Sequence, residues 1–185
     1  MAKTKKSNFA ILGMLALIKR GTGYDLKKHM ERSTQYFWKE TFSSIYPVLE
    51  DLETQQLITR VEEPIRSERK TNTYSLTPKG QDVLKDWLIQ QPENMQLRNE
   101  LLLKLYFGNL VPTSISIEHL KKYKSELSKK LITYQAFKKE LSATNSLESS
   151  YWLITLDHGI RLTATSLEWC TNSIKTLQSH ITRGT

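Results

Sequence analysis

The chain has 185 residues, of which 38% are apolar and 25% charged, and its formal net charge is +8. This length allows one medium domain or two small domains with cores of their own. The single cysteine, Cys170, excludes an intramolecular disulfide, and the four histidines show no metal-ligand spacing. The composition therefore predicts a protein without a cofactor in a reducing compartment, the cytoplasm.

The longest apolar-rich stretch, FAILGMLALI, has ten residues and is followed by Lys19 and Arg20. Because a membrane-spanning helix needs about 20 apolar residues, we expect no membrane association. A signal peptide is the alternative for this stretch, but KRGTGYDL lacks a small-residue cleavage pattern. The positive charge favours an anionic partner such as nucleic acid, although both halves of the chain carry it.

Residues 9–19 predict a buried helix that ends at the glycines of RGTGYDL. A second helix starts near Gly23 and includes YDLKKHMER, whose apolar residues share a face. In the third, SSIYPVLEDLE, we expect Ser43 or Ser44 to be the N-cap. Pro47 would then lie within or just beyond the first turn, where backbone N–H groups have little or no partner to lose.

Residues 57–62 and 72–76 alternate apolar and polar side chains, which is typical of two half-buried strands in a hairpin. Thr77 then caps a further helix with Pro78 at its first position, and Pro92 ends it. The order helix, helix, helix, strand, strand, helix over residues 1–91 predicts a winged helix-turn-helix domain.

Residues 92–185 show no strand pattern, so we expect a mainly α protein whose second domain is entirely helical. Apolar residues recur at heptad spacing in two long segments, and the polar string SATNSLESS between them predicts an antiparallel pair. We interpret the stripe on the last helix as a dimerisation seam made of Leu153, Leu156, Ile160, Leu167, Ile174 and Leu177.

The start of the third helix is the main candidate for contact with DNA, because hydroxyls and free backbone N–H groups suit base edges and phosphates. Capping and packing are the alternatives for its side chains. Lysines on or beside the second helix and basic residues at the hairpin tip are candidates for phosphate contact, with a solvated surface as the alternative. The candidate residues are Ser43, Ser44, Tyr46, Pro47, Lys27, Lys28, Lys39, Arg66, Arg69 and Lys70.

Large rings could line a pocket for a small aromatic effector, although core packing is the simpler role for any one of them. The candidates are Trp152, Tyr106, Phe107 and Trp87. Catalysis is not expected, since no nucleophile–base pair, phosphate-binding glycine loop or metal spacing occurs.

The stretches ILGMLALIKRGTGYDLKKHM, YFWKETFSSIYPVLEDLETQQLITR and TYSLTPKGQDVLKDWL, followed by LRNELLLKLYFG and SLEWCTNSIKTL, resemble PadR-like transcriptional regulators with a virulence-activator-type C-terminal domain. The resemblance covers nearly the whole chain. It implies a homodimer that reads a pseudo-palindromic operator with the helix beginning around SSIYP, so that the groove contacts fall on Ser43, Ser44, Tyr46 and Pro47. Many members have a glycine where this chain has Ser43.

We therefore expect a sequence-specific DNA-binding regulator, a homodimeric repressor acting on promoter DNA and released by a small aromatic or phenolic effector. The alternatives are an activator that works with a partner regulator, a non-specific nucleic-acid binder, and a helical adaptor that uses its winged helix to bind protein.

Overall fold

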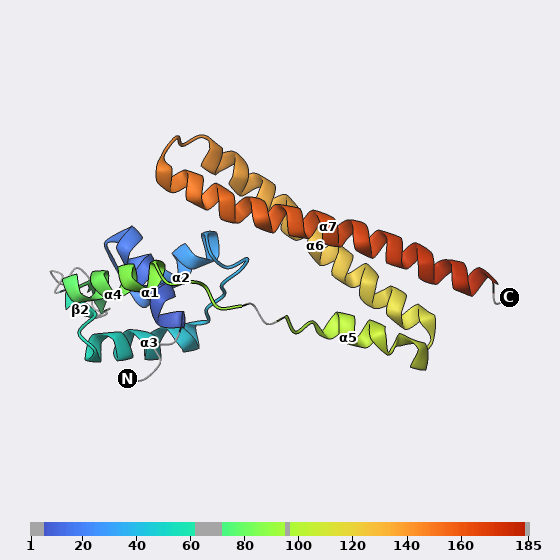
Figure 1. The fold of residues 1–185 in the computed structure, drawn as a ribbon, viewed down its shortest axis with the longest axis horizontal. Coiled ribbons are helices and arrows are strands. Elements are labelled where there is room, and N and C mark those ends of the chain that lie inside the picture. Colours follow the sequence, from blue (N-terminus) through green and yellow to red (C-terminus); the bar gives the residue numbers. More distant parts are fainter. Residues whose placement is uncertain (1–5, 62–71, 95–96, 184–185) are drawn as a thin grey trace, which may run out of the picture. The chain divides into compact units, whose positions relative to one another are not determined.

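The computed structural model describes residues 6–61, 72–94 and 97–183, and these residues form two compact units, Met1–Asn94 and Met95–Thr185. Each unit has its own apolar core. Figure 1 shows a mainly helical chain with a small sheet in the first unit. No helix within the described ranges has the length and apolarity needed to cross a bilayer.

The first unit begins with α1 (Lys6–Ile18), β1 (Arg20–Gly21), α2 (Gly23–Arg32) and α3 (Phe42–Thr54). It continues with β2 (Ile58–Val61), β3 (Thr73–Leu76) and α4 (Pro78–Leu88). The predicted hairpin pairs antiparallel, with Ile58 opposite Leu76. The strand β1 adds to the other edge of β3, which the sequence pattern did not predict, so the sheet order is β1-β3-β2.

Apolar side chains from α1, α2, α3, α4 and the hairpin meet in one core, which includes Leu12, Leu26 and Leu49 at 0% exposure. Phe9 of α1 stacks on Trp87 of α4 with ring centroids 4.5 Å apart. The helix α1 therefore lies in contact with α2, α3 and α4, and it fixes the helix-turn-helix against the sheet.

The end of α1 differs in detail from the prediction, whereas the start of α4 does not. Helix α1 ends at Ile18 because Lys19 turns into the left-handed region at φ 70°, ahead of the glycines that were expected to end it. Thr77 and Pro78 behave as predicted: Pro78 opens α4, and the Thr77 Oγ1 accepts a hydrogen bond from the Gly80 N–H at 3.0 Å.

The second unit contains α5 (Glu100–Tyr106), the 3-10 turn η1 (Gly108–Leu110), α6 (Thr113–Ser142) and α7 (Leu147–Arg183). The long helices α6 and α7 lie against one another as the predicted antiparallel pair. Leu120 and Leu127 of α6 and Cys170 of α7 are buried between them. Burial raises the pKa of the Cys170 thiol.

The stripe that was interpreted as a dimerisation seam packs within a single chain. Leu156 is 1% exposed, and Leu167, Ile174 and Leu177 pack against the cluster formed by α6 and α7. Leu153 and Ile160 are half-buried on the same helix. The heptad spacing correctly marks the buried face of α7, but the partner that buries it is α6 of the same chain.

Candidate nucleic-acid interface

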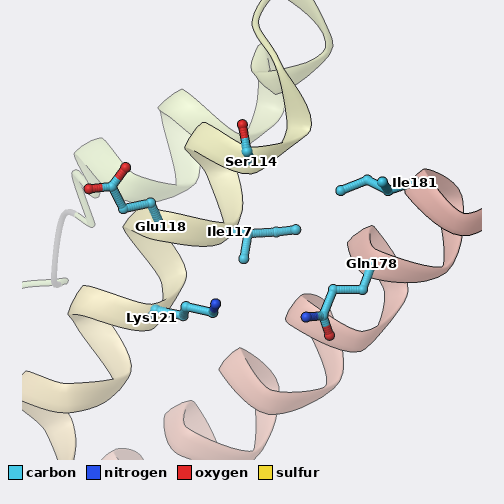
Figure 2. A pocket seen from close by; sticks show the side chains of 6 residues that line it. All are labelled: Ser114, Ile117, Glu118, Lys121, Gln178 and Ile181. Atoms are coloured by element: carbon cyan, nitrogen blue, oxygen red, sulfur yellow. The ribbon is translucent and has the colours of Figure 1, made fainter.

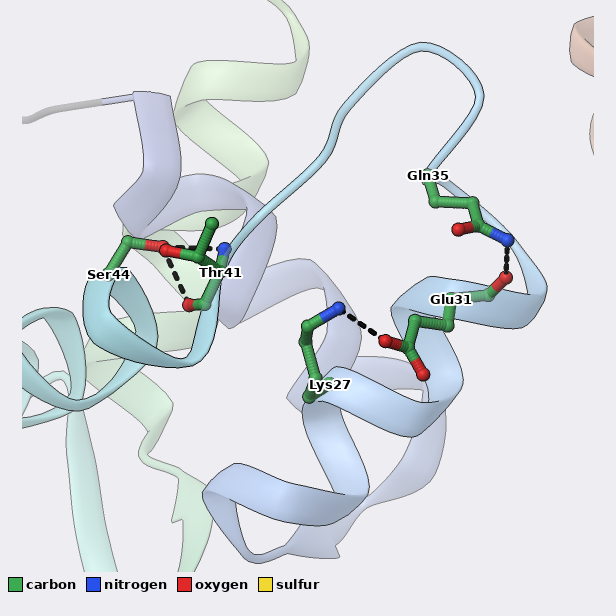
Figure 3. A network of polar contacts seen from close by, with 5 residues as sticks. All are labelled: Lys27, Glu31, Gln35, Thr41 and Ser44. Carbon is green, nitrogen blue, oxygen red and sulfur yellow. Dashed lines mark hydrogen bonds and ion pairs between the residues drawn. The ribbon is translucent and has the colours of Figure 1, made fainter. Parts of the chain in front are cut away.

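The N-cap of α3 is Thr41, two residues before the earlier of the two serines predicted for it. The Thr41 N–H donates to the Ser44 Oγ at 2.9 Å, and the Ser43 and Thr41 hydroxyls lie 2.8 Å apart. Figure 3 shows Ser44 folded back onto Thr41. The first turn of α3 is therefore held by three neighbouring hydroxyls, and Ser43 and Ser44 lie inside the helix.

Pro47 is consequently the sixth residue of α3, further along than the sequence predicted. A residue there normally donates its N–H to the carbonyl four residues earlier, which is that of Ser43, and proline has no N–H to donate. The helix continues through Pro47 to Thr54, because Ile45, Leu49 and Leu52 anchor the opposite face in the core.

The face of α3 that points away from the core presents most of the predicted groove-reading residues. Ser43 and Pro47 are exposed and Tyr46 is 52% exposed. Ser44 is only half-buried, but its hydroxyl is engaged inside the protein, since it donates to the Glu40 Oε2 at 2.7 Å. The structure thus brings Ser43, Tyr46 and Pro47 onto one surface, whereas the Ser44 hydroxyl binds Glu40 and stabilises the start of the helix.

Glu40 is a buried carboxylate at the base of this helix start, 8% exposed. The Trp38 Nε1 donates to it at 2.9 Å, in addition to Ser44. Burial by itself would raise the pKa of Glu40, but hydrogen bonds from Ser44, Ser7 and Trp38 outweigh it and hold the pKa below the ordinary value of 4.5. Glu40 therefore ties α1, the connection after α2 and the first turn of α3 together as an ionised group.

Two of the three predicted lysines are exposed. Lys28 projects from α2 and Lys39 lies just before α3, and both are free to approach a phosphate backbone. Lys27 is 9% exposed, and its Nζ lies 2.5 Å from the Glu31 Oε1 (Figure 3). The charge of Lys27 is thus neutralised within α2. Lys28, and not Lys27, is therefore the candidate phosphate contact on this helix.

The glycine at the start of α2 determines where the Tyr46 ring can lie. A Cβ placed on Gly23 would lie 2.9 Å from the Tyr46 Cε1. Next to this contact, Phe42 of α3 and Tyr24 of α2 stack with ring centroids 6.3 Å apart. Neither ring was among the predicted contact residues. The sequence signal for them is that each occupies one of the first two positions of a helix beside a polar cap.

The predicted hairpin-tip residues Arg66, Arg69 and Lys70 lie outside the described residues. Among the described residues no cluster of three or more histidine, cysteine, aspartate or glutamate side chains could hold a metal ion.

The four rings predicted to line an effector pocket are divided between the two units. Trp87 packs in the first unit on Phe9. In the second unit Tyr106 and Phe107 form an edge-to-face pair just before α6, whereas Trp152 lies near the start of α7. Since α6 has 30 residues, a length of about 45 Å, these rings lie at opposite ends of the α6–α7 pair.

A groove of about 600 Å³ opens instead between the start of α6 and the end of α7. In Figure 2 Ile117 and Ile181 point toward one another across it, and its other lining residues are Ser114, Glu118, Lys121 and Gln178. None of the predicted effector residues lines this groove.

Two family models match the chain in sequence. Residues 11–86 match the transcriptional regulator PadR-like family, and residues 97–178 match the virulence activator alpha C-terminal domain. The negative transcriptional regulator PadR of Bacillus subtilis is 34% identical over 102 residues, which are 54% of this chain and 54% of that protein. The chain therefore spans about half the length of this curated relative.

Solved structures share the fold over nearly the whole chain. Bacillus subtilis PadR in complex with operator DNA gives a TM-score of 0.81 at 24% identity, covering 94% of this chain and 99% of that one. The Vibrio cholerae virulence activator AphA gives 0.76 at 23% identity, covering 94% and 98%. Bacillus subtilis PadR in complex with p-coumaric acid gives 0.74 at 25% identity, covering 94% and 99%.

Proposed function

The chain belongs to the PadR-like family of DNA-binding transcriptional regulators, and we propose that it is a homodimeric repressor that reads its operator with the start of α3. The observation that carries the proposal is the exposed surface of Ser43, Tyr46 and Pro47, opposite a face of α3 that is fully buried. Because the opposite face of α3 packs in the core, the helix can present its first turns to a major groove without a conformational change.

The chemistry of this helix start suits base edges and phosphates. The Ser43 hydroxyl and the Tyr46 hydroxyl donate and accept hydrogen bonds, and the first backbone N–H groups of α3 favour anionic oxygens. Further along, the exposed Glu50 would repel phosphate, so the N-terminal end of α3 is the end that enters the groove.

Phosphate contacts from Lys28 and Lys39 would position the helix without reading sequence. Arg66, Arg69 and Lys70 remain proposed wing contacts on sequence grounds. Affinity should fall as salt rises, and each neutralised phosphate steepens the fall by about 0.9 in the slope of log affinity against log salt.

Dimerisation of the second unit would bring two α3 helices to half-sites one helical turn apart, about 34 Å. The proposal is supported by the outer face of α7, where Ile154 is 67% and Leu162 60% exposed. These side chains lie away from the α6–α7 core, so they are free to meet a second copy. We expect Ile154→Asp with Leu162→Asp to give monomers by sedimentation with helical content retained, and an unchanged dimer would place the interface elsewhere.

Release by a small aromatic acid is supported by the structure of the Bacillus subtilis relative with p-coumaric acid. The described residues do not single out a pocket for it, so p-coumaric acid itself is the probe. We expect its addition to dissociate this chain from operator DNA, whereas benzyl alcohol, which lacks the carboxylate, should leave the complex intact.

The function is tested by measuring the affinity of the chain for its own upstream promoter region, for scrambled duplex DNA and for RNA at two salt concentrations. A specific regulator binds the promoter more tightly than the other two at both salts. Equal affinity for all three would identify a non-specific nucleic-acid binder. If the promoter is bound, a transcription assay that shows activation would replace the repressor role with the activator alternative.

A further inference from the structure

Two aromatic rings stand exposed where α2 and α3 meet, outside the core of the first unit. Phe42, the first residue of α3, is 44% exposed and Tyr24, the second residue of α2, is 57% exposed. Their rings stack with an interplanar angle of 17°. Neither ring is among the buried residues of the apolar core cluster, so core packing does not account for the exposed part of this pair.

The Phe42 ring is held in place from within the protein. The Lys27 Nζ lies 5.7 Å from the ring centroid, and Glu31 holds the same ammonium group in an ion pair. Lys27 contacts the ring as a cation contacts an aromatic face. Because Tyr24 and Lys27 both contact the Phe42 ring, the ring is already fixed in the free protein. Binding through it therefore costs little conformational entropy.

The aromatic pair lies beside the residues proposed to read the groove. Phe42 directly precedes Ser43 on α3, and Tyr24 directly follows Gly23, against which the Tyr46 ring packs. Lys28 is four residues after Tyr24 on α2 and is therefore on the same side of that helix, and Lys39 is three residues before Phe42. An apolar spot with exposed lysines on the neighbouring segments suits a partner whose apolar group lies near phosphates.

In the major groove of DNA that apolar group is the C5-methyl of thymine, which distinguishes an A·T pair from the other pairs. We infer that Phe42, supported by Tyr24, is a specificity-determining residue that contacts the methyl group of a thymine in each operator half-site. The inference rests on the proposed function, because it requires the start of α3 to lie in the major groove.

The experiment replaces thymine by deoxyuridine, one position at a time, in an operator whose half-sites have been mapped by footprinting. This change removes one methyl group and keeps every hydrogen-bonding atom of the base. We expect wild-type affinity to fall about fourfold at one thymine per half-site, the effect of losing one buried methyl-sized group. Phe42→Ala should bind the thymine and deoxyuridine duplexes equally.

Phe37 provides a matched control, because it is an aromatic side chain of the same unit, 57% exposed, on the connection between α2 and α3. Phe37→Ala should retain the fourfold preference for thymine. Tyr24→Ala, which removes the support of the Phe42 ring, should reduce the preference and is the second variant if Phe42→Ala fails to fold. Urea unfolding of each variant verifies that the fold is retained.

The outcomes separate the inference from the function on which it rests. If the wild-type chain does not prefer the operator to scrambled DNA, both are overturned. If it binds the operator specifically but no deoxyuridine lowers affinity, or Phe42→Ala shows the same loss as wild type, the thymine contact is wrong and the regulator function stands. A Phe42→Ala variant that dissociates into monomers would overturn the contact as well, because the ring would then belong to a subunit interface.

Discussion

Replacing Gly23 by alanine tests whether the position of the Tyr46 ring, and not the stability of the fold, determines DNA affinity. The added Cβ would lie 2.9 Å from the Tyr46 Cε1, 3.1 Å from its Cζ and 3.3 Å from its hydroxyl oxygen. All three atoms belong to the far end of one side chain. The ring can therefore move away while the backbone of α2 and α3 stays in place.

The expected effects on stability and on binding have opposite signs. Alanine is favoured over glycine in a helix by up to about 1 kcal/mol, so the free energy of unfolding should stay constant or rise. A displaced Tyr46 would lose a groove contact, and a net hydrogen bond contributes about 1–1.5 kcal/mol, which corresponds to about five- to twelvefold in affinity. Binding should thus weaken in a protein that is at least as stable.

Urea unfolding and fluorescence anisotropy with labelled operator measure the two quantities on the same samples. Gly13→Ala is the control, since nothing lies within 4 Å of a Cβ at that position of α1. It should raise stability and leave operator affinity unchanged. Gly23→Ala should have no further effect on binding once Tyr46 has been replaced by alanine. Wild-type affinity in Gly23→Ala, or a loss of affinity that follows a loss of stability, would refute the reasoning.

Three further predictions concern the fold that supports the surface. A Cβ on Gly80 would lie 2.0 Å from the Leu57 carbonyl oxygen, a backbone atom, so Gly80→Ala should cost about 3 kcal/mol of unfolding free energy. An unchanged urea midpoint would contradict this close approach of the two backbones. Glu40→Gln should cost about 1–2 kcal/mol at neutral pH through weakened charge-assisted hydrogen bonds. Because the folded-state pKa of Glu40 lies below its ordinary value of 4.5, its carboxylate stabilises the fold above pH 4.5. The difference in unfolding free energy between wild type and Glu40→Gln should therefore close as the pH falls through the folded-state pKa. A difference that persists in acid would exclude this cause. Leu156→Asp, at 1% exposure, should destabilise the α6–α7 pair by about 3 kcal/mol or more, whereas Ile154→Asp should not, as helical circular dichroism against urea would show.

Strong periodicity made much of the fold predictable. The alternating stretches became β2 and β3, and the Thr77–Pro78 pair marks the start of α4 as expected. The strand β1 was missed because two residues cannot show an alternation. The N-cap of α3 was misplaced because TFSS offers three hydroxyl residues within four positions, and the choice of Thr41 depends on the buried carboxylate of Glu40 that binds Ser44.

The stripe on α7 shows what periodicity leaves open. Heptad spacing identifies a face that must be buried, but a helix of the same chain and a helix of a second copy bury it equally well. Leu156 is buried and Leu177 packs against the core shared by α6 and α7, so we propose that a dimer uses exposed side chains of α7 such as Ile154 and Leu162. The contact of Gly23 with Tyr46 was equally hidden, because it joins residues on different helices through a tertiary fold.

The ratio of operator affinity to scrambled-DNA affinity, measured at one salt concentration for wild type and Tyr46→Ala, tests the central claim most directly. If the start of α3 reads the groove, the variant should bind the operator about tenfold more weakly while its affinity for scrambled DNA and its sedimentation stay unchanged. An unchanged ratio in a folded variant would show that α3 does not read the operator through Tyr46.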